Sequence, residues 1–189
     1  QVTDGQMIIS IVAGIHTSQI AARLEASPPI VRTMPNTPAM IGLGITGMYA
    51  PIHCNLAQRQ LAQNLMESAG EVEWLDQEYL LDAVTAVSGS GPAYFYYLIE
   101  CLRDAGVRQG LPTDVAARLA LHTAHGACTL AIRSEADVDE LRERVTTPGG
   151  TTQAAMDVFK AGRFAALMDE AVAAATRRGR ELSGLEESA

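Results

Sequence analysis

The feature that most constrains the fold of this chain is a single change of pattern near residue 78. Before it, β-prone apolar runs alternate with helical stretches, and after it every long segment has helical periodicity. Alternating strands and helices are typical of a doubly wound α/β sheet, whereas consecutive helices are typical of an all-α domain. We therefore predict an α/β part over residues 1–77, followed by an α-helical domain over residues 78–189.

The α/β part contains several β-prone runs separated by turns and helices. The first, residues 7–13, is continuously apolar, which suits a strand buried on both faces of a parallel sheet. With the helix and strand after it, this run forms a β-α-β unit, whose ligands bind beyond the carboxyl ends of the strands. The predicted elements are a strand at 7–13, a helix at 16–24 capped by Thr17 or Ser18, strands at 30–34 and 45–50, a helix at 56–69 with Leu56, Leu61, Leu65 and Met66 on its apolar side, and an edge strand at 71–75.

Two short segments follow the first two strands and are candidates for ligand contact. They are Val12-Ala13-Gly14 and Met34-Pro35-Asn36-Thr37-Pro38. Two prolines fix the backbone of the second segment, so the polar groups of Asn36 and Thr37 are expected to face a ligand or each other. A purely structural turn explains the same residues about equally well, and both interpretations stay open.

Residues 42–47 match the G-x-G-x-x-G pattern that binds the pyrophosphate of a dinucleotide. The pattern has this function only where a strand precedes it and a helix begins at its third glycine. Here Met48-Tyr49-Ala50-Pro51 follows, which is β-prone and ends in proline, so no helix is expected. We therefore predict that residues 42–47 are not a phosphate loop.

The helical part is divided by segments that contain glycine and proline. Ser88-Gly89-Ser90-Gly91-Pro92 precedes one helix, with Pro92 in its first turn and Ser90 as its cap, and it lacks the G-x-S-x-G order of a hydrolase nucleophile. Thr113 is the predicted cap of a helix that runs to about residue 133. The remaining helices are predicted at 137–144, 153–160 and 163–182.

The loop of residues 144–156 is the most distinctive candidate site in the helical part. Pro148 fixes its own φ, the glycine pair after it allows positive φ and close approach of a ligand, and Thr151 or Thr152 caps the next helix. Free N–H groups at that helix start favour an anion such as a small carboxylate, and four threonine hydroxyls are available to a ring nitrogen. The loop has no Cys, His or carboxylate, which argues against nucleophilic or acid–base chemistry within it. A capped connection without function is the alternative.

Charge and cysteine usage argue against several classes of function. With 22 acidic and 14 basic residues the net charge is −8, which disfavours nucleic acid and anionic membranes as partners. Three widely spaced cysteines without a C-x-x-C pair indicate a reduced, cytoplasmic setting. His122, His125 and Cys128 are spread around a helix, so no metal site is predicted. The first residues contain neither a start methionine nor a signal-peptide pattern, and we expect the chain to begin within a longer protein.

Four segments stand out by their order and spacing: Ser10-Ile11-Val12-Ala13-Gly14, Met34-Pro35-Asn36-Thr37-Pro38, Val87-Ser88-Gly89-Ser90-Gly91-Pro92-Ala93-Tyr94 and residues 145–152. Together they resemble the pyrroline-5-carboxylate reductase family, which catalyses the last step of proline biosynthesis. The resemblance covers nearly the whole chain. It implies that residues 1–77 are the C-terminal part of a dinucleotide-binding, Rossmann-like domain and that residues 78–189 form a helical dimerisation and substrate-binding domain. The family's Gly-rich phosphate loop is not in this sequence, so the chain alone is expected to bind cofactor poorly and to show little activity.

The resemblance also implies roles for individual residues. NADPH or NADH would place its nicotinamide against six residues: Ala13, Gly14, Met34, Pro35, Asn36 and Thr37. The substrate would be held by a second set, with its carboxylate on backbone N–H groups: Glu135, Val145, Thr147, Gly149, Gly150, Thr151 and Thr152. Thr152 would be the catalytic residue, because its hydroxyl would hydrogen-bond to the ring nitrogen.

The activity implied is hydride transfer from NAD(P)H to C5 of the cyclic imine 1-pyrroline-5-carboxylate, giving L-proline, in a homodimer or a ring of dimers. This reaction needs mainly orientation and a polar partner for nitrogen, which suits a site rich in hydroxyls. One alternative is a β-hydroxyacid dehydrogenase of the same two-domain build. That class would carry a lysine on a core helix, whereas Lys160 is the only lysine here. The other alternative is a non-catalytic dimerisation fragment.

Overall fold

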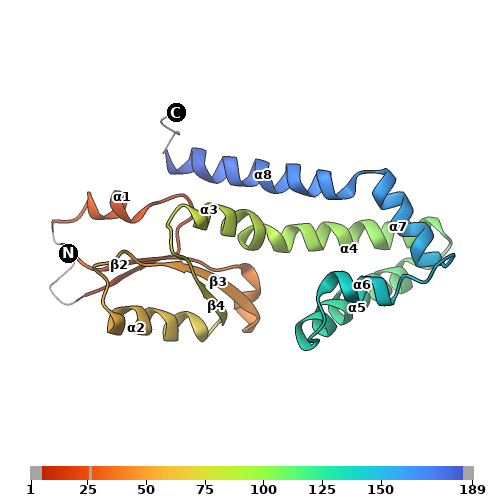
Figure 1. Ribbon diagram of the computed structural model, residues 1–189, viewed down its shortest axis with the longest axis horizontal. Coiled ribbons are helices and arrows are strands. Elements are labelled where there is room, and N and C mark those ends of the chain that lie inside the picture. Colours follow the sequence, from red (N-terminus) through yellow and green to blue (C-terminus); the bar gives the residue numbers. More distant parts are fainter. Residues whose placement is uncertain (1–5, 26, 185–189) are drawn as a thin grey trace. The chain divides into compact units, whose positions relative to one another are not determined.

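The structure is a computed structural model that describes residues 6–25 and 27–184 (Figure 1). The chain forms two compact units: Gln1–Pro92 with Glu170–Ala189, called the sheet unit here, and Ala93–Asp169, called the helical unit. The predicted combination of an α/β part and an α-helical part is confirmed. The boundary between residues 77 and 78 stays a prediction, because the sheet unit extends to Pro92. No helix in the described ranges combines the length and the apolar character of a membrane span.

A four-stranded sheet in the order β1-β2-β3-β4 forms the centre of the sheet unit. The strands are β1 (Ile8–Ser10), β2 (Ile30–Met34), β3 (Gly44–Tyr49) and β4 (Gly70–Trp74). The sheet is mixed: β1 pairs with β2 and β3 with β4 in parallel, but β2 pairs with β3 antiparallel. Only the 3₁₀-helix η1 (Thr37–Ile41) separates β2 from β3, and a connection this short cannot make the crossover that a parallel pair needs.

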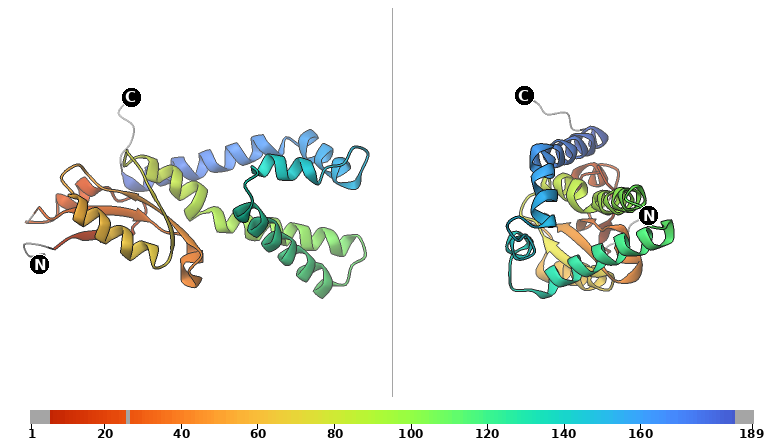
Figure 2. Two further views of the ribbon diagram at one scale, coloured as in Figure 1. Left: turned by 60° about the horizontal axis from the view of Figure 1, so that its bottom comes forward. Right: turned by 90° about the vertical axis from the view of Figure 1, so that its right-hand side faces the viewer.

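The two parallel pairs have helical crossovers, as the alternating pattern predicts. α1 (Thr17–Ala21) connects β1 to β2, and α2 (Leu56–Glu67) connects β3 to β4. α2 covers one face of the sheet, while α1 and α3 (Leu80–Val84) lie on the other (Figures 1 and 2). The N-cap of α1 is His16, which forms a capping box with Gln19, so the predicted caps Thr17 and Ser18 are wrong.

The first strand is shorter than the apolar run predicts. Pairing stops at Ser10, and the side chains of Ile11 and Val12 are 62% and 53% exposed. β1 lies at the end of the strand order and pairs only with β2 among the described residues, so the predicted strand over 7–13, buried on both faces, is wrong. The exposed end of the run is therefore a loop next to the sheet edge.

The packing of α2 corrects a second prediction. The helix begins at a capping box between Asn55 and Gln58, because an N-cap residue and a glutamine three positions later can bond to each other's backbone N–H groups. Ala62 is fully buried and Met66 packs against the core, but the other three predicted core residues are exposed: Leu56, Leu61 and Leu65. The inner side of the helix instead carries polar partners for the last strand.

Trp74 explains why polar residues of α2 face the sheet. Its indole N–H donates to Gln63 Oε1 at 2.9 Å, and the Arg59 guanidinium carbon lies 5.4 Å from its ring centroid. Arg59 also donates to the carbonyl oxygen of Ala50 at 2.7 Å. A half-buried indole needs an acceptor for its N–H, and an arginine stacks well on its ring. These polar contacts, and not a leucine-rich face, fix the orientation of α2 on the sheet.

After residue 79 the described chain consists of helices joined by short turns and loops. The elements are α3, the π-helical turn η2 (Thr85–Gly89), α4 (Gly91–Arg108), α5 (Thr113–Arg133), α6 (Val138–Arg144), α7 (Thr151–Ala161) and α8 (Phe164–Ser183). Two predicted caps are wrong: Ser90 has helical φ and ψ, and Pro112 rather than Thr113 is the N-cap of α5. The π-helical turn was not predicted; it places one extra residue between α3 and α4.

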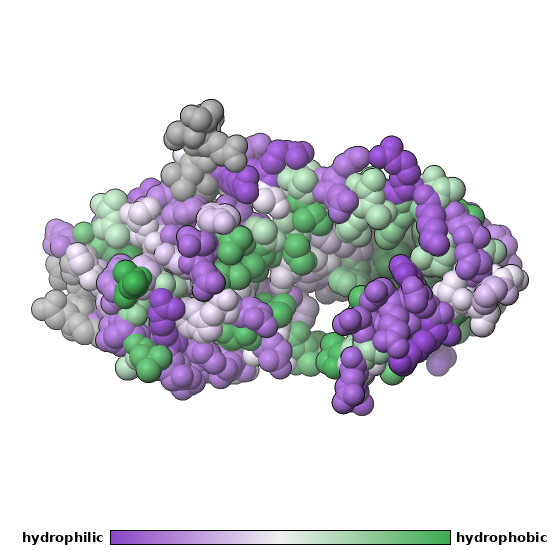
Figure 3. Space-filling model, in the orientation of Figure 1, coloured by the Kyte–Doolittle hydropathy of each residue, from purple (hydrophilic) through white to green (hydrophobic). Residues whose placement is uncertain are grey.

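The helical unit buries very little within one copy of the chain. Of residues 93–169, only Ala116 and Ala120 are buried. Apolar side chains are correspondingly common at the surface, as Figure 3 shows for one face of the molecule. The large exposed ones on α4 are Phe95, Tyr96, Tyr97, Leu98, Leu102 and Val107. Alanine contributes little buried area, so this unit lacks a conventional core of its own.

Candidate functional site

The carboxyl ends of β1 and β2 meet at one edge of the sheet because the two strands are parallel. The Thr33 hydroxyl donates to the Ser10 carbonyl oxygen at 3.1 Å, and the Ser10 side chain accepts from the Val12 N–H at 3.4 Å. Beyond β1 the chain turns at Ala13-Gly14, where Gly14 has a φ of 73° that glycine adopts without strain. Ala13 is exposed and Gly14 is buried, so only the Ala13 side of this turn is accessible at the sheet edge.

The segment after β2 is held by the side chain of Asn36. Asn36 Oδ1 accepts the Ile45 N–H at 3.0 Å, and Asn36 Nδ2 donates to Ser88 Oγ at 3.2 Å. The expectation that this amide faces Thr37 is therefore wrong, since its oxygen binds Ile45 and its nitrogen binds Ser88, while contact with a ligand stays a prediction. Thr37 is exposed, and Met34 and Pro35 are half-buried.

The π-helical turn η2 packs against the same segment. A Cβ atom added to Gly89 would lie 2.6 Å from Met34 Cε, so a side chain at this position would displace Met34. Ser88 is adjacent and accepts from Asn36. The motif Ser88-Gly89-Ser90, predicted only as a helix start, thus supports the carboxyl end of β2.

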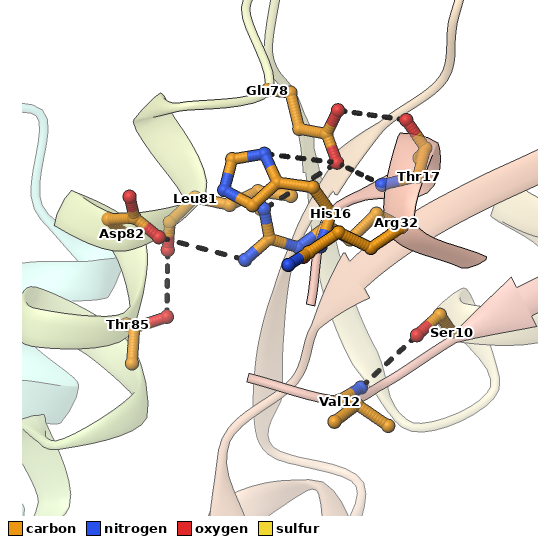
Figure 4. A network of polar contacts seen from close by, with 10 residues as sticks. Ser10, Val12, His16, Thr17, Arg32, Glu78, Leu81, Asp82 and Thr85 are labelled. Carbon is orange, nitrogen blue, oxygen red and sulfur yellow. Dashed lines mark hydrogen bonds and ion pairs between the residues drawn. The ribbon is translucent and has the colours of Figure 1, made fainter. Parts of the chain in front are cut away.

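A buried ionic network lies behind this edge of the sheet (Figure 4). Arg32, 2% exposed, places Nη1 3.6 Å from Glu78 Oε1 and Nη2 3.6 Å from Asp82 Oδ1. Glu78 accepts from the backbone N–H and the hydroxyl of Thr17 at 2.7 and 2.8 Å, and its Oε1 is 3.8 Å from His16 Nδ1. The network joins α1, β2 and α3 and so fixes the Gly14 turn relative to the end of β2.

The network was not predicted, although the sequence contains a signal. Arg32 interrupts the apolar run Ile30–Met34, and a buried charge needs a partner because its desolvation is costly. The partners lie about fifty residues further along the chain, so only the three-dimensional structure identifies them. Arg32 Nη1 forms no hydrogen bond to any described residue, so the charge depends on the ion pairs.

Backbone conformation and close packing explain why residues 42–47 contain three glycines, without a phosphate ligand. Gly42 ends η1 with a φ of 72°, and Gly44 and Gly47 lie within β3. A Cβ atom would lie 2.8 Å from Ala39 at Gly44 and 2.7 Å from Val84 at Gly47. No helix begins at Gly47, and the strand predicted over residues 45–50 is confirmed as β3.

The loop between α6 and α7 contains a tight turn. The Gly150 N–H donates to the Thr147 carbonyl oxygen at 3.0 Å, with Pro148 and Gly149 between them. Gly149 has a φ of 72°, as predicted, and this arrangement is that of a type II turn. Gly150 has a φ of −84°, so the prediction of positive φ holds only for the first glycine. A Cβ atom on Gly150 would lie 2.6 Å from Thr147 Oγ1, and close packing therefore explains the second glycine.

The start of α7 carries uncommitted hydrogen-bonding groups. Gly150 is the N-cap and gives no side-chain cap, so the predicted caps Thr151 and Thr152 are wrong. The backbone N–H groups of Thr151, Thr152 and Gln153 have no acceptor in the described ranges, and the first intrahelical bond comes from Ala154. A helix start with free N–H groups attracts anions.

Three of the four loop hydroxyls have no partner among the described residues. Thr146 donates its hydroxyl to the Arg142 carbonyl oxygen at 2.6 Å, so it is not available to a ligand as predicted. The hydroxyls of Thr147, Thr151 and Thr152 form no hydrogen bond with described residues. Thr152 is half-buried, and Thr147 and Thr151 are exposed.

The remaining candidates for substrate contact differ in position. Val145 is the C-cap of α6 and is 64% exposed. Glu135 is exposed in the connection between α5 and α6, and its carboxylate has no partner in the part of the chain that the structure describes. The structure thus collects the cofactor candidates at one sheet edge and the substrate candidates, apart from Glu135, in one loop.

A shallow pocket elsewhere in the helical unit carries none of these candidates. It is lined by side chains of α5: Val115, Arg118, Leu119, His122 and Thr123. Within residues 6–25 and 27–184, no three His, Cys, Asp or Glu side chains are grouped closely enough to hold a metal ion. The loop candidates offer mainly hydroxyls and backbone N–H groups, and the sheet edge adds one buried ionic network.

Comparison with known proteins gives consistent results. Residues 78–182 match the family model described as pyrroline-5-carboxylate reductase dimerisation. The curated pyrroline-5-carboxylate reductase of Pseudomonas aeruginosa is 48% identical over 178 residues, which cover 94% of this chain and 65% of that protein. The Vibrio alginolyticus enzyme is 36% identical over 181 residues, covering 95% and 66%. The chain thus spans about two thirds of the length of these curated relatives.

Solved structures show the same fold. The pyrroline-5-carboxylate reductase of Coxiella burnetii superimposes with a TM-score of 0.90 at 38% identity, covering 94% of this chain and 66% of that one. The Plasmodium falciparum pyrroline carboxylate reductase, solved with NADP bound, gives a TM-score of 0.86 at 29% identity, covering 94% and 70%. The family model over residues 78–182, the sequence identity to curated relatives and the superposition on solved structures all agree with the four sequence motifs. The chain belongs to the pyrroline-5-carboxylate reductase family.

Proposed function

We propose that the protein carrying this chain reduces 1-pyrroline-5-carboxylate to L-proline with hydride from NAD(P)H. The observation that carries the proposal is the start of α7, where three backbone N–H groups and the Thr152 hydroxyl, next to a type II turn, have no partner among the residues that the structure describes. A small imino acid offers a carboxylate for the N–H groups and a ring nitrogen for the hydroxyl. The names of the relatives support this choice of substrate.

In this proposal the loop residues hold the substrate and Thr152 orients its nitrogen. The backbone at Gly149, Gly150 and Thr151 receives the carboxylate, and Val145 and Thr147 line the site. Glu135 completes the site from the neighbouring connection. Orientation by fixed donors is an effective way to accelerate a reaction whose acceptor is already activated, as a protonated imine is.

The residues at the sheet edge fit the nicotinamide end of a dinucleotide. The turn at Ala13-Gly14 presents the exposed Ala13, while Gly14 is buried with positive φ, and Met34, Pro35, Asn36 and Thr37 follow a strand end at the same edge. When bound, the cofactor supplies the hydride, and the Plasmodium falciparum relative was solved with NADP. The 189 residues contain no strand–G-x-G-x-x-G–helix segment, so they fit the nicotinamide end and not the pyrophosphate.

We further propose that the protein is a cytoplasmic homodimer assembled through its helices. A unit that buries only Ala116 and Ala120 gains most of its apolar burial from a partner. A β-hydroxyacid dehydrogenase is disfavoured, since the only lysine, Lys160, is exposed in the last turn of α7. A non-catalytic dimerisation fragment would share every feature above, so an enzyme assay is needed to distinguish it from the reductase.

The proposal is tested by incubating the complete gene product with pyrroline-5-carboxylate and NADPH. We expect NADPH consumption at 340 nm and formation of L-proline in equal amounts, measured by chromatography. Turnover of a β-hydroxyacid in place of the imine would favour the dehydrogenase. No turnover of either substrate by a folded dimer would favour a non-catalytic role.

Replacing Gly149 with alanine tests the turn. A Cβ atom meets no atom within 4 Å there, but a residue with a φ of 72° costs an L-amino acid about 1–2 kcal/mol. We expect the KM for the imine to rise roughly tenfold as the turn relaxes and the N–H groups shift. The matched control is Gly126→Ala in α5, which also has open space but does not have positive φ. Equal KM values for the two variants would contradict a role for the turn.

A further prediction concerns the 189-residue chain on its own. Because its helical unit needs a partner and its sequence has no phosphate loop, we expect a dimer that binds L-proline weakly and shows almost no NADPH oxidation. Analytical ultracentrifugation and proline titration by calorimetry measure the first two properties. A monomer in sedimentation contradicts the assembly, and turnover near that of the complete gene product contradicts the need for a phosphate loop.

A further inference from the structure

Two hydrogen bonds fix the direction of the Asn36 amide. Its oxygen is 3.0 Å from the Ile45 N–H, which can only donate, so its nitrogen must face Ser88 Oγ at 3.2 Å. An amide nitrogen can only donate, and Ser88 Oγ is therefore the acceptor. The hydroxyl hydrogen of Ser88 is left to point elsewhere.

Ser88 has no acceptor for that hydrogen within the described ranges. Thr85, at the start of the same turn, behaves differently: its hydroxyl donates to the Leu81 carbonyl oxygen at 2.7 Å. Ser88 is half-buried, so its hydroxyl is neither fully solvated nor paired as a donor. A polar group left in this state is a candidate for ligand contact.

The position of Ser88 identifies the kind of ligand. It lies on a π-helical turn, a feature often found at functional sites, and next to Asn36 just beyond the carboxyl end of β2. Close packing between Gly89 and Met34 limits movement of the turn away from this strand end. Ligands of doubly wound sheets bind at such strand ends.

We propose that Ser88 donates its hydroxyl to the carboxamide oxygen of the nicotinamide and is a further cofactor-binding residue. This inference rests on the proposed function, which puts the nicotinamide at the same edge of the sheet. The Asn36 N–H withdraws charge from Ser88 Oγ and makes the hydroxyl a stronger donor. Asn36 thus acts as a positioning residue through Ser88.

The experiment measures NADPH dissociation constants of the complete gene product by fluorescence titration. We expect Ser88→Ala to weaken binding about three- to tenfold, which is the range for one neutral hydrogen bond. Ser88→Thr keeps a hydroxyl and should retain most of the affinity. The matched control is Ser90→Ala, which removes a nearby half-buried hydroxyl that does not bind Asn36.

A cofactor analogue separates direct contact from a general effect on the site. Thionicotinamide NADPH carries sulfur, a weak acceptor, in place of the carboxamide oxygen. Wild type and Ser88→Ala should bind this analogue with equal affinity, while they differ for NADPH. Thermal unfolding of each variant reports whether loss of the Asn36 partner affects the fold.

Two outcomes would overturn the Ser88 contact, and a third would overturn the proposed function. An equal loss of affinity for both cofactors in Ser88→Ala would show an effect on the fold or site and would overturn the contact. Unchanged NADPH affinity would overturn it as well. Failure of the wild-type protein to bind NADPH would overturn the proposed function, and this inference with it.

Discussion

Replacing Asp82 with alanine is expected to lower the free energy of unfolding of the sheet unit by about 3–5 kcal/mol, the range for removing one partner from a buried ion pair. Asp82 is 3% exposed and faces Arg32, which is 2% exposed. Arg32 would keep only the Glu78 carboxylate, 3.6 Å from an Nη1 that forms no hydrogen bond within the described ranges, so its buried charge would be poorly balanced. Urea denaturation followed by circular dichroism measures the change.

The control for this prediction is an exposed ion pair of shorter length. Glu140 lies 2.7 Å from Arg144 on the surface of α6, compared with 3.6 Å between Asp82 and Arg32. Glu140→Ala should cost only about 0.3–0.5 kcal/mol because solvent screens the pair. If both variants lost the same stability, burial would not be the reason that the network matters.

The second large effect is expected for Thr152→Ala in the complete gene product. If the half-buried hydroxyl orients the ring nitrogen, kcat/KM for the imine should fall 10- to 100-fold, about 1.4–2.7 kcal/mol. Thr152→Ser keeps the hydroxyl and should lose far less. Steady-state kinetics at several imine concentrations separate the effect on kcat from that on KM.

Thr129→Ala is the comparison variant for Thr152. The Thr129 hydroxyl is exposed on α5 and donates to the His125 carbonyl oxygen at 2.8 Å, so this variant removes a threonine hydroxyl from a helix outside the candidate site. We expect its kinetics to match those of wild type. Unchanged kinetics in Thr152→Ala would remove Thr152 from the site.

The order of strands and helices was predictable because its signals are local. Apolar runs, glycines and prolines near 30–34, 56–69 and 163–182 determine where elements begin and end. The direction of β3 was not predicted, although the short connection after Met34 determines it. The prediction of the apolar side of α2 was wrong because Trp74, which lies outside the helix, binds the polar side chains of Gln63 and Arg59.

The candidate site divides in the same way. Positive φ at Gly149 follows from Pro148 and the glycine itself, so the turn could be predicted. The identity of the cap could not, because the turn leaves Gly150 extended and makes it the N-cap of α7. The ionic network joins residue 32 to residues 78 and 82, and the partner of Asn36 lies 52 residues away. Contacts between such distant residues leave no periodic pattern in a single sequence.

The rate at which a reagent labels Cys54 reports how often the sheet unit opens. The Cys54 thiol is buried among Val31, Met48 and Ala62, with Sγ 3.7 Å from the Ile30 carbonyl oxygen, and burial raises the pKa of this thiol. Thiolate is the reactive form, so a disulfide reagent reaches Cys54 only when the sheet unit opens. Cys101 and Cys128 are exposed on the helical unit and lack this protection within one chain.

The same burial makes stability depend on alkaline pH. An unfolded thiol loses its proton near pH 8.5, whereas the folded Cys54 keeps its proton to higher pH. Above roughly pH 8.5 the unfolded state therefore binds fewer protons than the folded state, and the free energy of unfolding falls as pH rises. The rate of labelling at Cys54 should increase with pH for two reasons at once: more frequent opening and a larger thiolate fraction in the opened chain.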